Sequence, residues 1–299
     1  MSLHPQDLKS QALAVRQTLP EHGDLAISAL VGQPKFFDWV YCRPAPGTSF
    51  SMYLAGADDG VALRFFWNGH YERTTLRAWS HFARKSQIIL DIGAHTGAYT
   101  LAALASNGSA QTISFEPYFM NFSRLNMNLR GNGFSPSHAY MLGVGEKTAV
   151  MPFSVSSDVS YLSSGGSVGV RENAFTTHIQ VVALDDFFPD EMSSRIHLIK
   201  IDVEGFEAAC LRGMANLLRK SRPIIFFECT NLAAGREVQQ QLSQLGYVFF
   251  ASDEVTGQVT RVLDVTPATN EQGGLLMNQL NRIALPNEGL IEELRAAVG

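Results

Sequence analysis

The chain places acidic side chains beside glycine turns at two points, and each point could hold a small cationic ligand. The first is the segment Asp91-Ile92-Gly93-Ala94-His95-Thr96-Gly97-Ala98-Tyr99-Thr100. It follows QIILDI, which has the pattern of a buried strand, and it opens the helix-like AYTLAALAS. Glycines at such a point let the backbone turn tightly and approach a ligand closely. An aspartate just before the turn would repel a pyrophosphate but suits a cation.

A further acid, Glu116, ends the next predicted strand, QTISFE, and Pro117 then fixes the exit of the chain. An acid at this strand end can accept hydrogen bonds from both hydroxyls of a ribose. The glycine spacing G-x-x-x-G differs from the dinucleotide fingerprint G-x-G-x-x-G. S-adenosylmethionine fits these features, since it carries an ammonium and a sulfonium and no phosphate. The predicted cofactor contacts are Asp91, Gly93, Ala94, His95, Thr96, Gly97, Tyr99, Glu116 and Pro117, with Gly143 at the exit of the third strand.

The string LIKIDVEGFE, which ends at Glu207, is the most informative in the chain. Alternate side chains of a strand share a face, so Lys200, Asp202 and Glu204 are expected on one side if the strand continues that far. They would lie at the carboxyl end of a strand, in the same crevice as the first turn, and Asp202 joins the predicted cofactor contacts. Glu207 either caps the following helix or faces the crevice. For Glu228, at the end of PIIFFE, a local structural role and a place in the crevice are likewise both open.

A base is needed if the ligand's methyl group goes to an aliphatic hydroxyl, which is a poor nucleophile while it keeps its proton. A positioned base contributes about 10²–10⁴-fold to such a reaction. Asp202 and Glu204 are candidates because the strand pattern places them in the crevice. His95 competes with them, since histidine is the commoner base and this one lies inside the cofactor turn itself. The three stay open as catalytic candidates.

Strand-like and helix-like segments alternate from residue 87 onward, which predicts a parallel sheet covered by helices on both faces. The expected fold is therefore α/β and Rossmann-like, with a doubly wound, mostly parallel seven-stranded sheet. The clearest predicted strands are 87–92, 111–116, 139–144, 196–202 and 222–228.

Two units are expected: an extension over residues 1–69 and a cofactor domain over 70–299. The extension is expected to hold a helix over 5–19, with loops and short strands over 34–60, and to serve as a substrate cap or a dimer contact in a possible homodimer. A helix is expected over 71–84. Within the cofactor domain, 146–184 breaks the alternation with Ser- and Gly-rich text and a β-like HIQVVAL. This insertion is expected to form a loop or hairpin over the ligand-binding edge of the sheet.

Composition narrows the class of partner. The formal net charge is −5 and there is no run of Lys or Arg, so nucleic acid is not expected as a partner. No apolar run approaches the length of a membrane span, and the first residues lack the segments of a signal peptide. The three cysteines form no C-x-x-C, which suits a reducing compartment and a place in the core. We expect a cytoplasmic protein with a small molecule as its partner.

Five segments in this order resemble the FkbM family of S-adenosylmethionine-dependent methyltransferases. They are ILDIGAHTGAYT, FEP followed by the N-x-N of RLNMNLRGNGF, ALDDFF, LIKIDVEGFE and PIIFFE. Glu72, in GHYE before the first strand, is similar to a further acid that recurs in the family. The similarity covers about residues 70–250, whereas residues 1–69 match nothing that we can name.

The resemblance implies a class I methyltransferase fold and methylation of a hydroxyl on a sugar or a polyketide-type natural product. Carried over by position, Asp91, Gly93 and Gly97 would face the methionine part of the cofactor. Glu116 would hold the ribose, and Asp202 would form the wall of the crevice.

Two other classes stay open at this point. A nicotinamide-dependent oxidoreductase would use a similar sheet, although the chain lacks its glycine fingerprint. A non-catalytic module that binds S-adenosylmethionine would keep the first turn and lose the acids of LIKIDVEGFE. No metal is expected, because the chain has no H-x-x-x-H or H-x-x-E-H and the acids come from separate strand ends.

Overall fold

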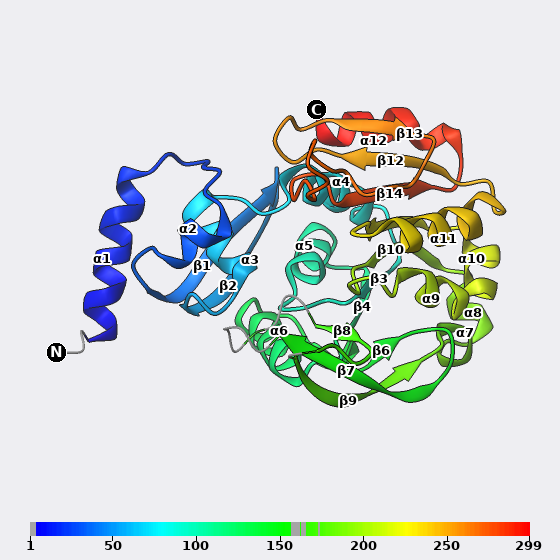
Figure 1. The fold of residues 1–299 in the computed structure, drawn as a ribbon, viewed down its shortest axis with the longest axis horizontal. Coiled ribbons are helices and arrows are strands. Elements are labelled where there is room, and N and C mark those ends of the chain that lie inside the picture. Colours follow the sequence, from blue (N-terminus) through cyan, green and yellow to red (C-terminus); the bar gives the residue numbers. More distant parts are fainter. Residues whose placement is uncertain (1–3, 157–161, 163–165, 173) are drawn as a thin grey trace.

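The centre of the molecule is an eight-stranded sheet with helices on both faces (Figure 1). The structure is a computed structural model that describes residues 4–156, 162, 166–172 and 174–299. The strands lie side by side in the order β13 (Val259–Val262), β12 (Val248–Ser252), β14 (Asn281–Leu285), β11 (Ile224–Glu228), β10 (Ile196–Ile201), β3 (Ile88–Ile92), β4 (Gln111–Phe115) and β5 (Ala139–Tyr140).

Five neighbouring strands, from β11 to β5, run parallel, and β14, β12 and β13 each pair antiparallel. The α/β class and the doubly wound order are confirmed, with β3 and β10 side by side where the order reverses. The count of seven strands was wrong, because β13 adds an eighth. A turn closed by the Asp253 carboxylate, which accepts from the N–H of Val255 and Thr256, folds this short strand back onto β12. Four residues without an alternating pattern give little sequence signal.

The predicted third strand, 139–144, divides between two sheets. Only Ala139 and Tyr140 join the large sheet, as β5, whereas Gly143 and Val144 form β6 in a second sheet. The other strands expected in the parallel part are confirmed, and every residue of β3 is buried.

Helices cover the large sheet on both faces, as the alternation predicted. Two separate clusters of buried apolar side chains mark these faces. One cluster includes side chains of α4 (Arg73–Ala83), α5 (Ala98–Ser106), α6 (Phe119–Gly131) and α12 (Ile291–Val298). The other is covered by α7 (Leu184–Phe187), α8 (Asp190–Ser193), α9 (Glu207–Arg212), α10 (Ala215–Ser221) and α11 (Leu232–Ser243). Short 3₁₀ turns occur at η1 (Pro136–His138) and η2 (Glu288–Leu290).

The N-terminal segment forms α1 (Pro5–Thr18), α2 (Ile27–Val31), β1 (Phe36–Ala45), β2 (Thr48–Gly56) and α3 (Gly60–Asn68), and it occupies one end of the molecule (Figure 1). The helix expected over 5–19 is confirmed. The loops and short strands expected over 34–60 were wrong, because β1 and β2 form one long antiparallel hairpin. Burial alternates along both strands, with Phe50, Met52 and Leu54 inward on β2. These side chains share one core with α4, α5 and α6.

The predicted insertion forms most of a second, four-stranded sheet. Its strands lie in the order β6 (Gly143–Val144), β9 (Ala174–Val182), β7 (Ala149–Ser156) and β8 (Ser167–Val168). Strands β7 and β9 pair along their whole length as an antiparallel hairpin. Most of the Ser- and Gly-rich part of the insertion lies outside the described residues. Phe153 of β7 stacks on Tyr118, which follows β4, so this sheet adjoins the carboxyl end of the large one.

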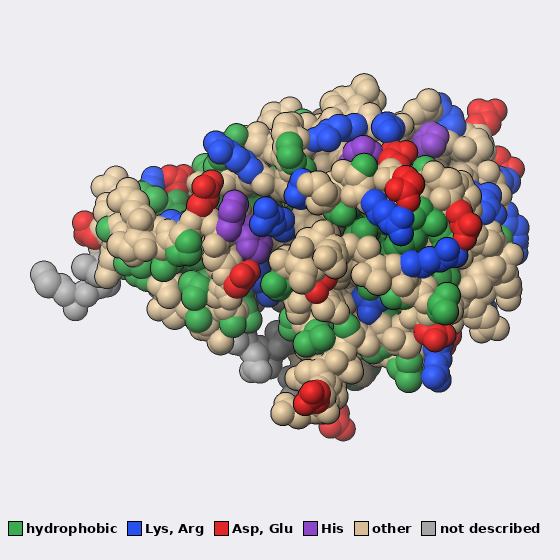
Figure 2. All heavy atoms as spheres, turned by 90° about the horizontal axis from the view of Figure 1, so that it is seen from above, with side chains coloured by type: hydrophobic (Ala, Val, Ile, Leu, Met, Phe, Trp, Pro, Cys, Tyr) green, Lys and Arg blue, Asp and Glu red, His purple; other side chains and the backbone are tan. Residues whose placement is uncertain are grey.

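On the face shown in Figure 2, Lys and Arg side chains lie among Asp and Glu side chains rather than in one patch. Within the described part of the chain, no helix has the length and apolar content to cross a membrane. All three cysteines are buried and unpaired, which confirms their expected place in the core.

Candidate active site

The turn after β3 has a backbone that only glycine can supply at two positions. Gly93 has φ +80° and Gly97 has φ +101°, both in the left-handed region. A Cβ at Gly93 would lie 1.8 Å from the carbonyl oxygen of Asp202, and one at Gly97 would lie 2.5 Å from Leu125 Cδ1. The spacing D-x-G-x-x-x-G therefore fixes a turn that is wedged between β10 and α6.

Asp91 lies beneath this turn and is only 1% exposed. Its Oδ2 accepts a hydrogen bond of 2.5 Å from the Thr100 hydroxyl in the first turn of α5. In the sheet it stands directly beside Lys200 of β10. Burial raises the pKa of the Asp91 carboxyl to about 6, against the lowering effects of Thr100 and Lys200.

Glu116 closes the other side of the turn and is 4% exposed. Its Oε2 accepts from the backbone N–H of His95 at 2.8 Å, and its Oε1 accepts from that of Tyr118 at 2.9 Å. Burial raises the pKa of Glu116 to about 7, although these backbone donors oppose the shift. The two predicted acids are therefore brought together at one turn, with Pro117 directly after Glu116.

Lys200 lies among the acids at the end of β10, and its side chain is fully buried, at 1% exposure. Its Nζ donates to Asp202 Oδ2 at 3.0 Å and to Asn281 Oδ1 of β14 at 3.1 Å, and it lies 4.9 Å from the centre of the Tyr99 ring. Burial alone would lower the pKa of Lys200, but Asp202 and Glu72 raise it above its usual value. The ammonium therefore stays charged and holds the Asp202 carboxylate.

Glu204 has a left-handed backbone, φ +54°, at the turn that follows β10. Burial and the neighbouring carboxylates of Asp202 and Glu207 raise its pKa to about 7. Burial and the charges of Asp202 and Glu204 also raise the pKa of Glu228, at the end of β11. The side chains of Asp202, Glu204 and Glu228 are thus electrostatically coupled around one crevice.

Glu207 is engaged locally, by the loop that precedes α9 rather than by the N–H groups of that helix. It is 2% exposed, and its Oε1 accepts from the N–H groups of Val203 and Gly205. Glu72 lies at the start of α4 with φ +39° and accepts a hydrogen bond from the Tyr99 hydroxyl. Glu72 thus contacts Tyr99, whose ring lies beside the Lys200 ammonium, although Glu72 precedes the first strand of the large sheet.

His95, which the sequence proposed as a cofactor contact and as a candidate base, lies within the turn and contacts its neighbours there. Its backbone N–H holds Glu116, and its ring Nδ1 lies 3.2 Å from the Thr96 hydroxyl. The ring Nε2 is buried and has no hydrogen-bond partner among the described residues. Burial lowers the pKa of the imidazole, against Asp59 and Asp202, so the ring is neutral at pH 7.

Gly143 is the predicted contact that lies apart from this group. It belongs to β6 of the second sheet, where a Cβ would press on Ile179 and Val181. Its role towards a cofactor stays a prediction. A cavity of about 550 Å³ lies at the opposite, amino end of β4, lined by Gln111 and Thr112, and includes none of the acids above. In the described part of the chain, no three His, Cys, Asp or Glu side chains are arranged to hold a metal ion.

Sequence reasoning missed Asn281 and Glu254, which lie far along the chain from the groups they bind. Asn281 fixes Lys200, and Glu254 accepts from the N–H of Thr74 at 2.7 Å at the start of α4. Neither belongs to a local motif, so no spacing signal could have found them. The strand pattern had placed Lys200 and Asp202 on one side of the strand, and the structure pairs them.

The model of the methyltransferase FkbM domain matches residues 91–249. This span covers just over half of the chain, and it begins at Asp91 and ends in β12. The chain belongs to the FkbM methyltransferase family. The match includes Glu116 and the acids after β10, and it excludes the N-terminal extension.

Several solved methyltransferases are similar to this FkbM methyltransferase at low identity. The FkbM methyltransferase of Methylobacillus flagellatus is 16% identical, with a TM-score of 0.42, over 75% of this chain and 52% of that one. The present chain thus spans about half the length of that protein. A precorrin-6y C5,15-methyltransferase of Geobacter metallireducens is 13% identical, with a TM-score of 0.39, over 72% and 87% of the two chains. A SAM-dependent O-methyltransferase of Thermotoga maritima is 11% identical, with a TM-score of 0.36, over 72% and 64%. No curated protein matches the chain.

The ligand-free FkbM methyltransferase is expected to lose stability as the pH rises from 5 to 8. Asp91 and Glu116 have folded-state pKa values of about 6 and about 7, against 3.8 and 4.5 for ordinary carboxyls. The folded state therefore holds more protons than the unfolded state in this range, and between pH 5 and 8 the free energy of unfolding falls by roughly 1.5 kcal/mol through Asp91 and roughly 2.5 kcal/mol through Glu116. Urea unfolding at several pH values measures the slope.

The variant Glu116→Gln provides the control, because the amide oxygen can still accept from the backbone but the group no longer titrates. Its stability should change less with pH than that of the wild type. A wild-type slope equal to that of the variant would contradict the raised pKa of Glu116.

Proposed function

We propose that this chain binds S-adenosylmethionine at the turn after β3 and transfers the methyl group to a hydroxyl of a sugar or polyketide-type natural product. Family membership supports methyl transfer. The observation that favours a hydroxyl acceptor is the raised pKa of Glu204, about 7, at the turn after β10 beside Asp202. A group with this pKa can take up a hydroxyl proton near neutral pH.

The residues around the turn fit the chemistry of this cofactor. Asp91 and Glu116 are buried carboxylates whose ionisation would be favoured by an ammonium and a sulfonium nearby. Each Glu116 oxygen accepts one backbone hydrogen bond, and a carboxylate has further acceptor sites that a ribose hydroxyl can use. Gly93 and Gly97 let the turn pack directly against the Asp202 carbonyl and Leu125 in its left-handed conformation.

When bound, the cofactor supplies a methyl group on a sulfonium, which the acceptor oxygen attacks in line. With the cofactor bound, a Glu204 oxygen would accept the hydroxyl proton as the acceptor oxygen takes the methyl group from the sulfonium. Asp202 is a weaker candidate for this proton, because Lys200 donates to its carboxylate at 3.0 Å. Asp202 instead keeps a fixed negative charge at the wall of the crevice.

Titration calorimetry tests the cofactor, with NAD as the comparison, and transfer from labelled S-adenosylmethionine to a panel of hydroxylated sugars and polyketides tests the acceptor. We expect binding of S-adenosylmethionine and not of NAD, and label in an ether product. Binding of NAD alone would favour an oxidoreductase. Binding of S-adenosylmethionine with no transfer to any hydroxylated compound would favour a non-catalytic module.

A further inference from the structure

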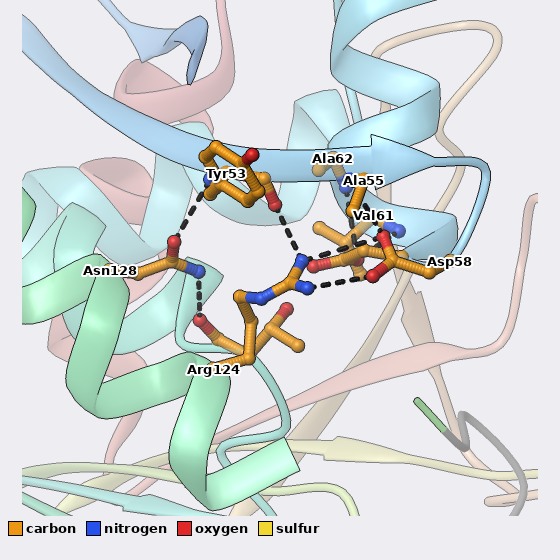
Figure 3. Close-up of polar contacts among 9 residues, drawn as sticks. Tyr53, Ala55, Asp58, Val61, Ala62, Arg124 and Asn128 are labelled. Atoms are coloured by element: carbon orange, nitrogen blue, oxygen red, sulfur yellow. Dashed lines mark hydrogen bonds and ion pairs between the residues drawn. The ribbon is translucent and has the colours of Figure 1, made fainter. Parts of the chain in front are cut away.

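The outer edge of β2 pairs with side chains of α6 instead of a third strand (Figure 3). The Ser51 N–H donates to Asn132 Oδ1 at 2.7 Å, and Asn132 Nδ2 donates back to the Ser51 carbonyl at 2.7 Å. Two residues along, the Tyr53 N–H donates to Asn128 Oδ1 at 2.9 Å, and Arg124 donates to the Tyr53 carbonyl at 2.8 Å. The three α6 residues are four positions apart, so they share one face of the helix.

Arg124 also anchors the chain just after β2. Its Nη2 lies 2.7 Å from Asp58 Oδ2, and both side chains are largely buried. The other Asp58 oxygen accepts from the Ala55 N–H at 3.0 Å. Figure 3 shows these contacts side by side with the Tyr53–Asn128 bond. This face therefore holds the free edge of β2 at Ser51 and Tyr53, and the chain beyond it at Asp58.

Asn128 differs from Asn132 because it also reaches the cofactor turn. Its Nδ2 donates to the Thr96 carbonyl at 2.8 Å, and the residue is fully buried. The two partners, an N–H of β2 and a carbonyl of the turn, fix which end of the amide faces each. Leu125, one turn earlier in α6, packs against Gly97 of the same turn.

The position of Thr96 matters for the groups that would bind a cofactor. The preceding residue, His95, holds Glu116 through its N–H, and Gly97 closes the turn by donating to the Ala94 carbonyl at 2.8 Å. If β2 moved away, the Asn128 amide would lose the Tyr53 N–H that fixes its orientation, and its Nδ2 would be held less firmly against the Thr96 carbonyl. The turn could then lose the Asn128 amide donor that holds the Thr96 carbonyl in place.

We propose that Asn128 is a positioning residue through which docking of the N-terminal extension sets the affinity of the turn for its cofactor. The proposal rests on the proposed function, since it takes S-adenosylmethionine as the ligand of the turn. Coupling of this kind is reciprocal, so the cofactor strengthens docking of the extension by the same factor. The extension is then part of the cofactor site although it lies outside the span that matches the family.

Asn128→Ala and Asn132→Ala form a matched pair for the test, because the first releases one bond to β2 and the second releases two, and only the first releases the turn. Titration calorimetry should show S-adenosylmethionine binding about tenfold more weakly to Asn128→Ala and within about twofold of wild type to Asn132→Ala. At saturating cofactor, kcat should stay within about twofold in both, so that the loss falls on KM for the cofactor. Equal affinities in the two variants would overturn the proposal.

Hydrogen exchange of single amides gives a second readout that does not depend on the variants folding equally well. In the wild type, added S-adenosylmethionine should slow exchange of the Tyr53 amide more than that of Ser51. In ligand-free protein, Asn128→Ala should speed exchange at Gly97 and His95, and Asn132→Ala should not. If S-adenosylmethionine fails to bind the wild type, the proposed function is wrong, and the ligand-free comparison still decides whether Asn128 holds the turn. Unchanged exchange at Gly97 and His95 would overturn the role of Asn128.

Discussion

Glu204→Gln is expected to lower kcat by about 10²–10⁴-fold while the affinity for S-adenosylmethionine changes little. The amide keeps the size of the side chain but cannot accept the hydroxyl proton. The wild-type kcat/KM should rise with pH through about 7, because the carboxylate form of Glu204 grows as the pH passes its pKa of about 7. This limb should be absent in the variant. Steady-state kinetics between pH 5.5 and 9 measures both effects.

His95→Asn is the matched control, because the neutral imidazole of His95 is the other group that could take the proton. We expect it to keep most of kcat, and the same assay measures its KM for the cofactor. A large loss of kcat in His95→Asn together with near-normal activity in Glu204→Gln would assign the base to the histidine Nε2, which has no partner among the described residues.

Lys200→Met is expected to lower the free energy of unfolding by roughly 3–5 kcal/mol, the usual cost of removing one partner of a buried ion pair. The side chain is 1% exposed, and its ammonium donates to both Asp202 and Asn281. Its loss leaves the Asp202 carboxylate without its cation among the acids of the crevice. Methionine has a similar length, so the effect reports charge rather than volume. Urea unfolding at pH 7.5 measures the change.

The double variant Lys200→Met with Asp202→Asn tests whether the pair is the cause. Removing the second charge should recover part of the lost stability, and the double-mutant cycle gives the interaction between the two side chains. If the two single losses simply add, Lys200 stabilises the fold through contacts other than Asp202.

The glycine turn and its acids could be predicted because each depends on a short stretch of chain. Gly93 and Gly97 are needed locally for a left-handed backbone, and Asp91 and Glu116 end adjacent parallel strands, which meet at one edge of a sheet. The hairpin β1–β2 could not be recognised in the same way. Its Pro, Gly and aromatic residues read as loops, whereas the pairing of two long strands is decided by their common core with α5 and α6.

The sequence by itself determined the α/β fold, the position of the cofactor turn and the acids that surround it, because periodicity and spacing act over a few residues. Only the tertiary structure decided the state of each acid. Glu207 is tied to backbone N–H groups, Asp202 is paired with Lys200, and Glu204 is left with a raised pKa. The tertiary structure also decided that the Asn128 amide bonds both to β2 and to the Thr96 carbonyl. These outcomes depend on burial and on contacts between distant segments, and neither is visible until the chain has packed.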